Sequence, residues 1–403
     1  MRSYLPEGHV TDGSVDYKQH IQACFDEHLA ILFAGSDDPQ RPMVHGIAAE
    51  SMGRILRTRP GTHLLFGPNA IIRRLPSMSD LIMLGQGTRV EGAVVDDNKY
   101  AHWPLVKDRP VRPYAFAIGH AFMMGGRNVL SDCVVYDNAG IAFGAWSTSD
   151  NRLFRCRDEN CGFLEATGRL EWAGEQAPAD GFYFSGHGRY NTVKDSTAID
   201  WSRWDFAPTE NMAYCSFMDC RGGDLNIRSY GFIDIESAGP ANTLVRCRSP
   251  NSHITVQQFA QDIVACRASH VAAEHAEHLR MLWNTTSGGA IHACQILDDR
   301  LISPGRTSPM LIGNRVVLAG PDSNHSLTVV ASDGVGTAAD NVVYGREEGE
   351  RRSTPMLLYG VGARSHNLQV WGKWPHLMAP AGTVSYTHAT FDRDSFKKPQ
   401  SGE

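Results

Sequence analysis

Short, strongly apolar segments of β type recur at a nearly constant spacing along most of this chain. Between about residues 80 and 345, segments of four to six residues rich in β-branched and aromatic side chains alternate with Gly, Asn, Asp and Ser. Comparable segments begin 25 residues apart at Phe116 and Ile141, and again at Ile254 and Leu279. A repeat of roughly 20–30 residues with two or three short strands is typical of the coils of a solenoid.

A second series of segments begins with Asn or Asp and ends in Cys, as in Asn151–Cys156, Asn242–Cys247 and Asp262–Cys266. One coil cannot bury its inward side chains alone, so coils must stack and each strand must pair in parallel with its counterpart. Corner Asn, Cys and Ser side chains fit this arrangement because they can hydrogen-bond or stack at the strand spacing of about 4.8 Å. An antiparallel sandwich or barrel is the alternative, but the Asn-Gly and Asp-Gly hairpin turns that favour it are nearly absent.

The opening stretch Thr11–Cys24 continues into an amphipathic pattern that predicts a short helix. It resembles the N-terminal capping helix of the pectate-lyase and phage-tailspike superfamily, in which an Asp is followed by an Ile-Gln-Ala word. The stretches Leu64–Ile72 and Val90–Asp97 are similar to the first coils of that superfamily. The resemblance covers roughly residues 10–345. It implies an all-β, right-handed, single-stranded parallel β-helix of the pectin-lyase-like kind behind an N-terminal capping helix.

Three regions are expected along the chain. Residues 1–60 are interpreted as the capping helix and lead-in, with a second helix near 47–57, and residues 61–345 as the parallel β-helix. Two gaps near 42 residues predict long loop insertions between 144 and 225. Residues 346–403 are interpreted as last coils or a C-terminal cap with a disordered tail.

Enzymes of this superfamily act on an outer parallel sheet or in a cleft beside inserted loops, so the resemblance directs the search to the insertions. The densest polar and aromatic cluster runs from Asp180 to Asp205. In β-elimination from a uronic acid sugar, a base removes the C5 proton and a cation stabilises the enolate. The candidates for this chemistry are His187, Arg189, Tyr190, Lys194, Asp200 and Arg203.

Glycoside hydrolysis instead requires two carboxylates, for which Asp180, Asp195, Asp200, Asp205 and Asp224 are available. Aromatic rings of this cluster offer flat faces that stack on sugars. The expected substrate-binding residues are Asp180, Tyr183, Trp201, Trp204, Asp205 and Asp224. The alternative is that the aromatic residues fill a small core of the loop itself.

Two short words resemble known families without completing their motifs. Gly186-His187-Gly188 is similar to the Gly-His-Gly word of polygalacturonase-type hydrolases, but the accompanying Asp-Asp, Asn-Thr-Asp and Arg-Ile-Lys words are missing. The stretch Ser229–Glu236 resembles the Tyr-Gly-Phe opening of mannuronan epimerases but lacks the following Asp-Pro-His. Neither chemistry is assigned from these words.

No metal or cofactor is assigned. The stretch Ser269–His278 carries His and Glu at spacings compatible with a metal ligand set, but a solvated loop or coil face explains it better. Calcium in a carboxylate pocket stays open, although no Asp-x-Asp-x-Asp loop is present. The nine cysteines form no CxxC motif and several sit inside apolar words, which predicts reduced, buried thiols.

The formal net charge of −6 and the absence of a basic run argue against a nucleic-acid groove, and a polyanionic substrate would require a local basic patch. The sequence shows neither a secretory signal nor a run of about 18 apolar residues. We therefore expect a protein of the cytoplasm or of a phage particle, without membrane or nucleic-acid partners.

Three functions remain open. The first is a carbohydrate-active enzyme on a polysaccharide or oligosaccharide, a polysaccharide lyase ahead of a glycoside hydrolase because the cluster combines bases with cations. The second is a tailspike-type module that binds surface glycan, for which the superfamily implies a homotrimer. The third is a cytoplasmic isomerase or cyclase that uses the scaffold for a small metabolite.

Overall fold

The computed structural model consists almost entirely of parallel β structure. It describes residues 4–48, 55–76, 80–106, 119–138, 140–161, 180–199, 204–208, 212–222, 233–235, 241–257, 261–274, 279–286, 291–293, 309–317, 327–330, 336–344, 357–359, 364–371, 373–374, 384–387 and 390–391. Helices in these ranges are α1 (Lys18–Glu27) and α2 (Lys99–Val106). Neither is long and apolar enough to cross a lipid bilayer.

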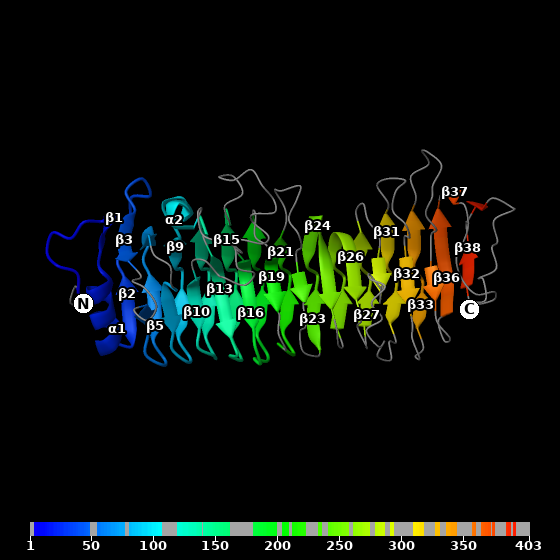
Figure 1. Cartoon of the computed structure of the whole chain (residues 1–403), viewed down its shortest axis with the longest axis horizontal. Helices are drawn as coiled ribbons and strands as arrows, with labels where there is room; N and C mark the ends of the chain where they lie inside the picture. The colour runs from blue at the N-terminus through cyan, green and yellow to red at the C-terminus, as the bar shows by residue number, and fades with distance from the viewer. Residues whose placement is uncertain are drawn as a thin grey trace. The chain divides into compact units, whose positions relative to one another are not determined.

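Contacts divide the chain into two compact units. Unit 1 comprises Met1–Cys215 and Cys220–Gly231, and unit 2 comprises Ser216–Asp219 and Phe232–Glu403. In each unit short strands follow one another around a coil, and every strand pairs in parallel with a strand of the next coil (Figure 1). This is the right-handed parallel β-helix that the repeat and the resemblance predicted, and the antiparallel alternative is excluded.

Unit 1 contains three parallel sheets. Sheet I is formed by β4 (Leu56–Arg57), β7 (Ile82–Leu84), β10 (His120–Met124), β13 (Ile141–Trp146), β16 (Asp180–Ser185) and β19 (Trp204–Pro208). Sheet II is formed by β2 (Ala30–Phe33), β5 (His63–Phe66), β8 (Arg89–Glu91), β11 (Val129–Ser131), β14 (Arg152–Phe154) and β17 (Thr192–Lys194). Sheet III is formed by β1 (Asp12–Asp16), β3 (Met43–Ala48), β6 (Ala70–Leu75), β9 (Val94–Asp96), β12 (Val134–Tyr136), β15 (Arg157–Glu159), β18 (Thr197–Ile199) and β21 (Arg221–Gly222).

Unit 2 also contains three sheets. Sheet IV is formed by β22 (Ile233–Ile235), β24 (Arg248–Gln257), β26 (Arg267–Glu274), β29 (Ile291–Ala293), β32 (Leu327–Val330) and β35 (Leu357–Tyr359). Sheet V is formed by β20 (Ser216–Met218), β23 (Asn242–Val245), β25 (Gln261–Val264), β27 (Leu279–Leu282), β30 (Met310–Ile312), β33 (Thr337–Ala339) and β36 (Arg364–Trp371). Sheet VI takes the first residues of β24 and β26, then β28 (Thr285–Thr286), β31 (Arg315–Val317), β34 (Val342–Tyr344) and the end of β36. Beyond these, β38 (Val384–Thr387) pairs with β36, and β37 (Lys373–Trp374) with β39 (Thr390–Phe391).

The core of unit 1 is built from columns of identical inward positions. On sheet I, Phe122, Phe143, Phe182 and Phe206 are fully buried and stack face to face, with ring centroids 5.8, 4.9 and 4.6 Å apart. The four phenylalanines are 21, 39 and 24 residues apart in the sequence, yet strand pairing places one Phe per coil at the same register. Stacked aromatic rings contribute interaction free energy beyond that of the apolar area that they bury.

Corner asparagines satisfy backbone groups along the coil axis, as the second series of segments predicted. In unit 1, Asn151 Nδ2 donates to Asn191 Oδ1 at 2.9 Å. In unit 2, Asn284 donates to Asn314, and Asn314 to Asn341, both at 3.0 Å. These buried amides pair with one another and with main-chain groups, so the corners are hydrogen-bonded without solvent.

The described cysteines are all free thiols, and all but Cys24 are buried. Cys156 Sγ lies 3.7 Å from the carbonyl oxygen of Leu130 in the preceding coil. Burial raises the pKa of the Cys133 and Cys266 thiols well above the usual range. These residues therefore act as small, inert core side chains at the corners.

The N-terminal region departs from one expectation. The helix predicted near 47–57 is wrong where residues are described, because β3 extends to Ala48 and Leu56 lies fully buried in β4 on sheet I. Coil strands are already present before residue 61, since β2 pairs with β5 and β3 with β6. The strand expected at Phe116–Ile118 and the tail from Asp392 lie outside the described residues, and the three-region division stays a prediction.

Replacing Phe182 with Ala should lower the free energy of unfolding by about 3–5 kcal/mol, because the ring is buried between two stacked neighbours. Urea titration followed by circular dichroism measures this change. Phe154→Ala is the matched control, since this ring lies half-buried on the outward side of β14. Equal losses in the two variants would contradict the role of the phenylalanine column.

Candidate functional site

Three of the predicted catalytic residues lie together on the connection between β16 and β17 of unit 1. His187, Arg189 and Tyr190 are all exposed. Hydroxyl groups of the preceding coil hold their backbone: Ser147 Oγ accepts from the His187 amide at 3.3 Å, and Ser149 Oγ from the Arg189 amide at 3.0 Å. The corner therefore presents a base, a cation and a phenol to solvent on a fixed backbone.

Exposed aromatic rings lie at and next to the same corner. Tyr190 is 54% exposed and stacks on Tyr214 of the next coil, with ring centroids 5.2 Å apart and planes 29° apart. Trp146, 50% exposed, ends β13 in register with Ser185 of β16. We call Trp146, His187, Arg189, Tyr190 and Tyr214 the corner surface.

Both tyrosines of the corner surface have left-handed backbone conformations, with φ of 59° for Tyr190 and 55° for Tyr214. Bulky side chains rarely adopt this region, which favours Gly, Asn and Asp. The same corner of earlier coils carries Arg127 and Asp150 in this conformation. The fold thus requires the left-handed residue, and the sequence places an exposed aromatic ring on it in two consecutive coils.

Lys194 lies on the outward side of β17, on sheet II beyond the corner. Its Nζ is 3.8 Å from Asp195 Oδ2, and both side chains are largely exposed. Among the described residues, this is the ion pair that Lys194 makes. Its predicted catalytic role stays a prediction.

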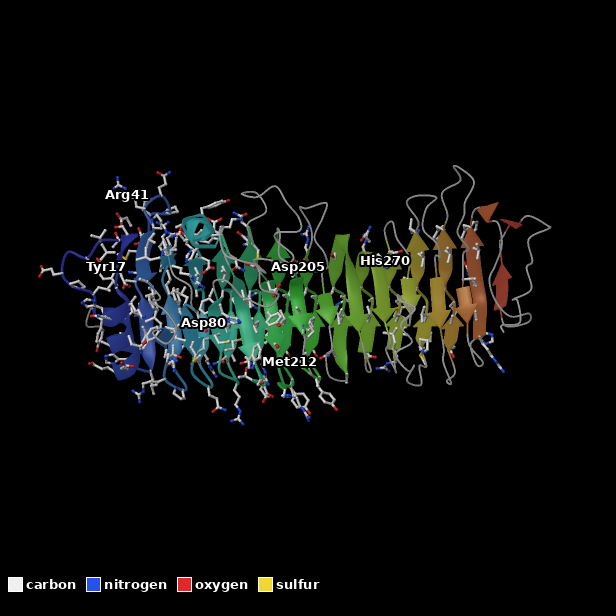
Figure 2. All side chains as sticks on the ribbon, viewed as in Figure 1. Tyr17, Arg41, Asp80, Asp205, Met212 and His270 are labelled. Atoms are coloured by element: carbon white, nitrogen blue, oxygen red, sulfur yellow. The ribbon has the colours of Figure 1, made fainter. Side chains whose placement is uncertain are left out.

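The predicted substrate-binding residues of sheet I lie inside unit 1. Asp180 and Asp205 are 0% and 1% exposed, and Tyr183 is 7% exposed and packs with Ile141 and Ala207. Side chains on both faces of β16 are buried. The exposed side chains next to β16 lie at the corner that follows it, whereas Asp205 lies within the coils (Figure 2).

Four further predicted residues, Asp200, Trp201, Arg203 and Asp224, lie outside the described residues. Trp204 is the first residue of β19 and is in register with Asp180. The role proposed for each of the five stays a prediction.

Three buried carboxyl groups, Asp158, Asp180 and Asp205, lie where sheet III leads into sheet I. The sequence pointed to Asp180 and Asp205 but not to Asp158. Asp158 occupies an inward position of β15, and its Oδ1 accepts from Asn138 Nδ2 at 3.1 Å. Its Oδ2 has no hydrogen-bond partner in the described part of the chain. Gly181 permits this approach, because a Cβ there would lie 3.2 Å from Asp158 Oδ2.

Burial raises the pKa of Asp158 well above its usual range; hydrogen bonds from Cys161 and Asn138 oppose the shift, and the nearby Asp205 carboxyl adds to it. A carboxyl in such a site is stable when it is protonated. No motif in the sequence marks Asp158, which sits in an ordinary Arg-Asp-Glu segment.

A second polar pair at the start of sheet I was also missed. Asp80 Oδ1 lies 2.7 Å from His120 Nδ1 and 2.8 Å from the His120 amide. Burial opposes ionisation of Asp80, but the hydrogen bond and charge of His120 outweigh it and lower the pKa of the carboxyl. The ring lies against Gly144, where a Cβ would come within 1.9 Å of His120 Cδ2. The two residues are 40 positions apart, so only the coil stacking brings them together.

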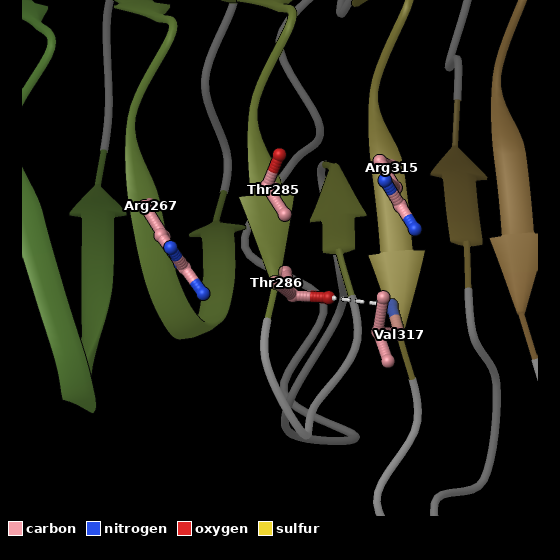
Figure 3. Close-up of a pocket in the computed structure, with 5 residues that line it drawn as sticks. All are labelled: Arg267, Thr285, Thr286, Arg315 and Val317. Carbon is pink, nitrogen blue, oxygen red and sulfur yellow. Dashed lines mark hydrogen bonds between the residues drawn. The ribbon is translucent and has the colours of Figure 1, made fainter. Parts of the chain in front are cut away.

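Unit 2 contains an open groove of about 460 Å³ on sheet VI (Figure 3). It is lined by Arg267, Thr285, Thr286, Arg315 and Val317. Every ionisable side chain of this lining is an arginine. No group of His, Cys, Asp and Glu within the described ranges of either unit is arranged to hold a metal ion.

Comparisons with known proteins identify the fold. No model of a known protein family matches the chain, and no curated protein sequence matches it. The structure of PfbA, a surface adhesin of Streptococcus pneumoniae, matches with a TM-score of 0.51 and 12% identity over 93% of this chain and 92% of that chain. The chain therefore has the pectin-lyase-like β-helix fold that the resemblance implied.

Two further solved structures match less closely. The tailspike protein of E. coli bacteriophage HK620 in complex with a pentasaccharide matches with a TM-score of 0.44 and 11% identity, over 96% of this chain and 64% of that chain. An endo-xylogalacturonan hydrolase from Aspergillus tubingensis matches with a TM-score of 0.47 and 8% identity, over 94% of this chain and 98% of that chain.

Replacing Asp158 with Asn should change how stability depends on pH. Because the folded pKa of Asp158 is raised, its stabilising contribution is complete below the unfolded pKa of about 3.9 and is lost as pH rises through the folded value. Asp158→Asn should therefore be more stable than the parent at pH 7, by about 1–3 kcal/mol. Urea titrations between pH 4 and pH 8 measure the difference.

Asp132→Asn is the control with the opposite sign. Hydrogen bonds from Arg155 lower the pKa of Asp132, so its contribution is present above the unfolded pKa and is lost as pH falls. This variant should lose stability at neutral pH. If both variants changed stability in the same direction at neutral pH, the raised pKa of Asp158 would be contradicted.

Proposed function

We propose that this chain recognises a carbohydrate polymer on the outer surface of the β-helix and that the corner surface of unit 1 contacts it. The carrying observation is the stacked, exposed Tyr190–Tyr214 pair, held in a left-handed backbone conformation in two consecutive coils. The corner imposes the left-handed conformation in each coil, and here it leaves two stacked aromatic rings exposed to a ligand. Sugar rings stack on such faces while their hydroxyl groups bond to neighbouring polar side chains.

The polar residues of the corner surface suit the rest of a sugar. His187 and Arg189 supply hydrogen-bond donors on a backbone fixed by Ser147 and Ser149. The ligand would therefore meet a surface that is ordered before binding, which limits the entropy lost on association.

Tyr190→Ala and Tyr214→Ala should each weaken glycan binding about tenfold, through loss of a stacking face. A glycan array identifies the ligand, and isothermal titration of the full-length chain measures the change. Trp283→Ala is the control: Trp283 of unit 2 is 60% exposed and also left-handed, with φ of 54°. If binding is indifferent to both tyrosines, the corner surface is not the site.

β-Elimination is the chemistry that the corner surface favours. Its described side chains include a phenol, an imidazole and a guanidinium, whereas the carboxylates Asp180 and Asp205 are buried away from any ligand there. In such a reaction Tyr190 or His187 would accept the C5 proton and Arg189 would stabilise the enolate. The C4–O glycosidic bond would then break, a C4–C5 double bond would form, and the departing sugar oxygen would take a proton from solvent. Hydrolysis by two carboxylates lacks support from these buried groups.

Tyr190→Phe separates binding from elimination, because it keeps the ring and removes the hydroxyl. If Tyr190 is the base, this variant should still bind but should release unsaturated ends at least about a hundredfold more slowly, the usual contribution of a positioned base. Ultraviolet absorbance of the unsaturated products measures the rate. Binding without product from a broad polysaccharide panel would leave a glycan-binding module instead.

The proposal includes side-by-side association into a homotrimer. Sheet V of unit 2 carries an outward row of half-buried apolar side chains in register from coil to coil: Met218, Val245, Val264, Leu282 and Ile312. Contiguous apolar surface of this kind favours contact with another protein surface. Light scattering on the purified chain distinguishes a trimer from a monomer.

A further inference from the structure

Three arginines occupy one outward column of sheet VI in unit 2. Arg248 of β24 is in register with Arg267 of β26, Arg267 with Thr285 of β28, and Thr285 with Arg315 of β31. We call Arg248, Arg267 and Arg315 the arginine row. We propose that the arginine row is a binding site for a linear anionic glycan, with Arg267, Thr285 and Arg315 as its centre.

The arginine row differs from Arg246 and Arg280 of unit 2, each of which has a carboxylate counterion. Arg246 contacts Asp219 through two hydrogen bonds of 2.6 Å, and Arg280 contacts Asp262 in the same two-pronged way. Over the stretches of unit 2 that the structure describes, the arginine row makes no ion pair. Unit 2 therefore pairs Arg246 and Arg280 with carboxylates and leaves the arginine row available to a ligand.

This arrangement costs stability without a ligand. Like charges placed directly opposite one another on neighbouring strands repel, and Arg248 and Arg267 are such a pair. The chain as a whole carries a net charge of −6, so the row is not part of a generally basic surface. A bound anion between the side chains would remove the repulsion. Anion binding therefore accounts for the arginine row, whereas packing does not.

The groove places a hydroxyl between two guanidinium groups. Thr285 lies between Arg267 and Arg315 in the column, and all three line the groove of about 460 Å³ (Figure 3). The guanidinium forks and the hydroxyl supply donors, which match the acceptor oxygens of a carboxylate or sulfate. Thr286 Oγ1 accepts a hydrogen bond from the Val317 amide at 3.3 Å, and both residues also line the groove.

Arg315 is oriented before a ligand arrives. Its guanidinium lies over the Tyr344 ring, 4.6 Å from the centroid, and Tyr344 in turn stacks on Trp371 with planes 8° apart. A guanidinium stacked on an aromatic face keeps its N–H edges free for hydrogen bonds. The tyrosine therefore acts as a positioning residue for Arg315.

The spacing selects a polymer. Neighbouring parallel strands lie about 4.8 Å apart, so the charges of the row follow one another along the direction in which coils stack. A chain of acidic sugars can place successive anions along this line. Single-stranded nucleic acid would require aromatic rings on which its bases could stack, and the groove is lined by arginine, threonine and valine side chains. That the polymer is a glycan rests on the proposed function, whereas the anion site does not.

Binding of polygalacturonate oligosaccharides to the full-length chain tests the proposal by isothermal titration. Arg267→Gln and Arg315→Gln should each weaken binding about tenfold, as expected for a lost charge-assisted contact. Arg280→Gln removes the same charge from a paired arginine of unit 2 and should change affinity less than twofold. Raising the salt concentration should weaken binding of the parent, and neutral dextran should not bind the row.

Thermal unfolding supplies a readout that does not depend on the ligand. Arg248→Gln should raise the midpoint by relieving repulsion with Arg267, whereas Arg280→Gln should lower it by breaking the pair with Asp262. A variant that unfolds at the parent's temperature but fails to bind has lost the site and not the fold.

Several outcomes would overturn the inference. These are unchanged affinity in the Arg267→Gln/Arg315→Gln double variant, equal losses in Arg280→Gln, and no binding of either polygalacturonate or dextran sulfate. Tighter binding of oligothymidylate than of an oligouronate with equal charge would assign the row to nucleic acid instead. The proposals for the corner surface and for the arginine row can be tested separately. Tyr190→Ala should leave uronate binding at the arginine row intact. The Arg267→Gln/Arg315→Gln variant should leave binding at the corner surface intact.

Discussion

Parallel, in-register stacking of coils is the constraint on which the rest of each unit depends. Every residue of a strand has neighbours at the same register about 4.8 Å away on both sides, so each column must tolerate its own repetition. Phe143 on Phe182 and Asn314 on Asn341 gain from that repetition. Arg248 beside Arg267 is destabilised by that repetition, because the two positive charges repel. Packing therefore accounts for the phenylalanine column but not for the arginine row.

Burial decides which surfaces of unit 1 can meet a ligand. Side chains on both faces of β16 are buried, so this strand of sheet I contributes core and no accessible binding face. Asp180 at the start of this strand and Asp158 on β15 are also fully buried. The exposed groups of the corner surface instead lie at or beside the left-handed corner positions, where the chain turns. Corner positions repeat once per coil, which allows Tyr190 and Tyr214 to stack.

Sequence periodicity predicted the fold because the strand segments repeat, and the confirmed corners at Asn151 and Cys156 follow from the same repeat. The arginine row was harder to predict from the sequence, for a physical reason. Consecutive members of the column from Arg248 through Arg267 and Thr285 to Arg315 are 19, 18 and 30 residues apart, because connections between strands differ in length. No fixed spacing in the sequence marks them as neighbours. Conversely, Asp180 and Tyr183 looked like site residues because polarity and aromaticity were visible in the sequence, while their burial was not.

The acidic net charge and the arginine row are compatible because they act over different distances. At physiological ionic strength the Debye length is about 8 Å, so distant acidic groups are screened at the row. Neighbouring strands are closer than that, so adjacent guanidinium groups and anions bound between them interact with little screening. A single anion contacts one or two arginines, whereas a polymer contacts the whole arginine row and loses its translational freedom only once. The column therefore discriminates by the spacing of charge along the ligand, a property that a net charge of −6 neither predicts nor opposes.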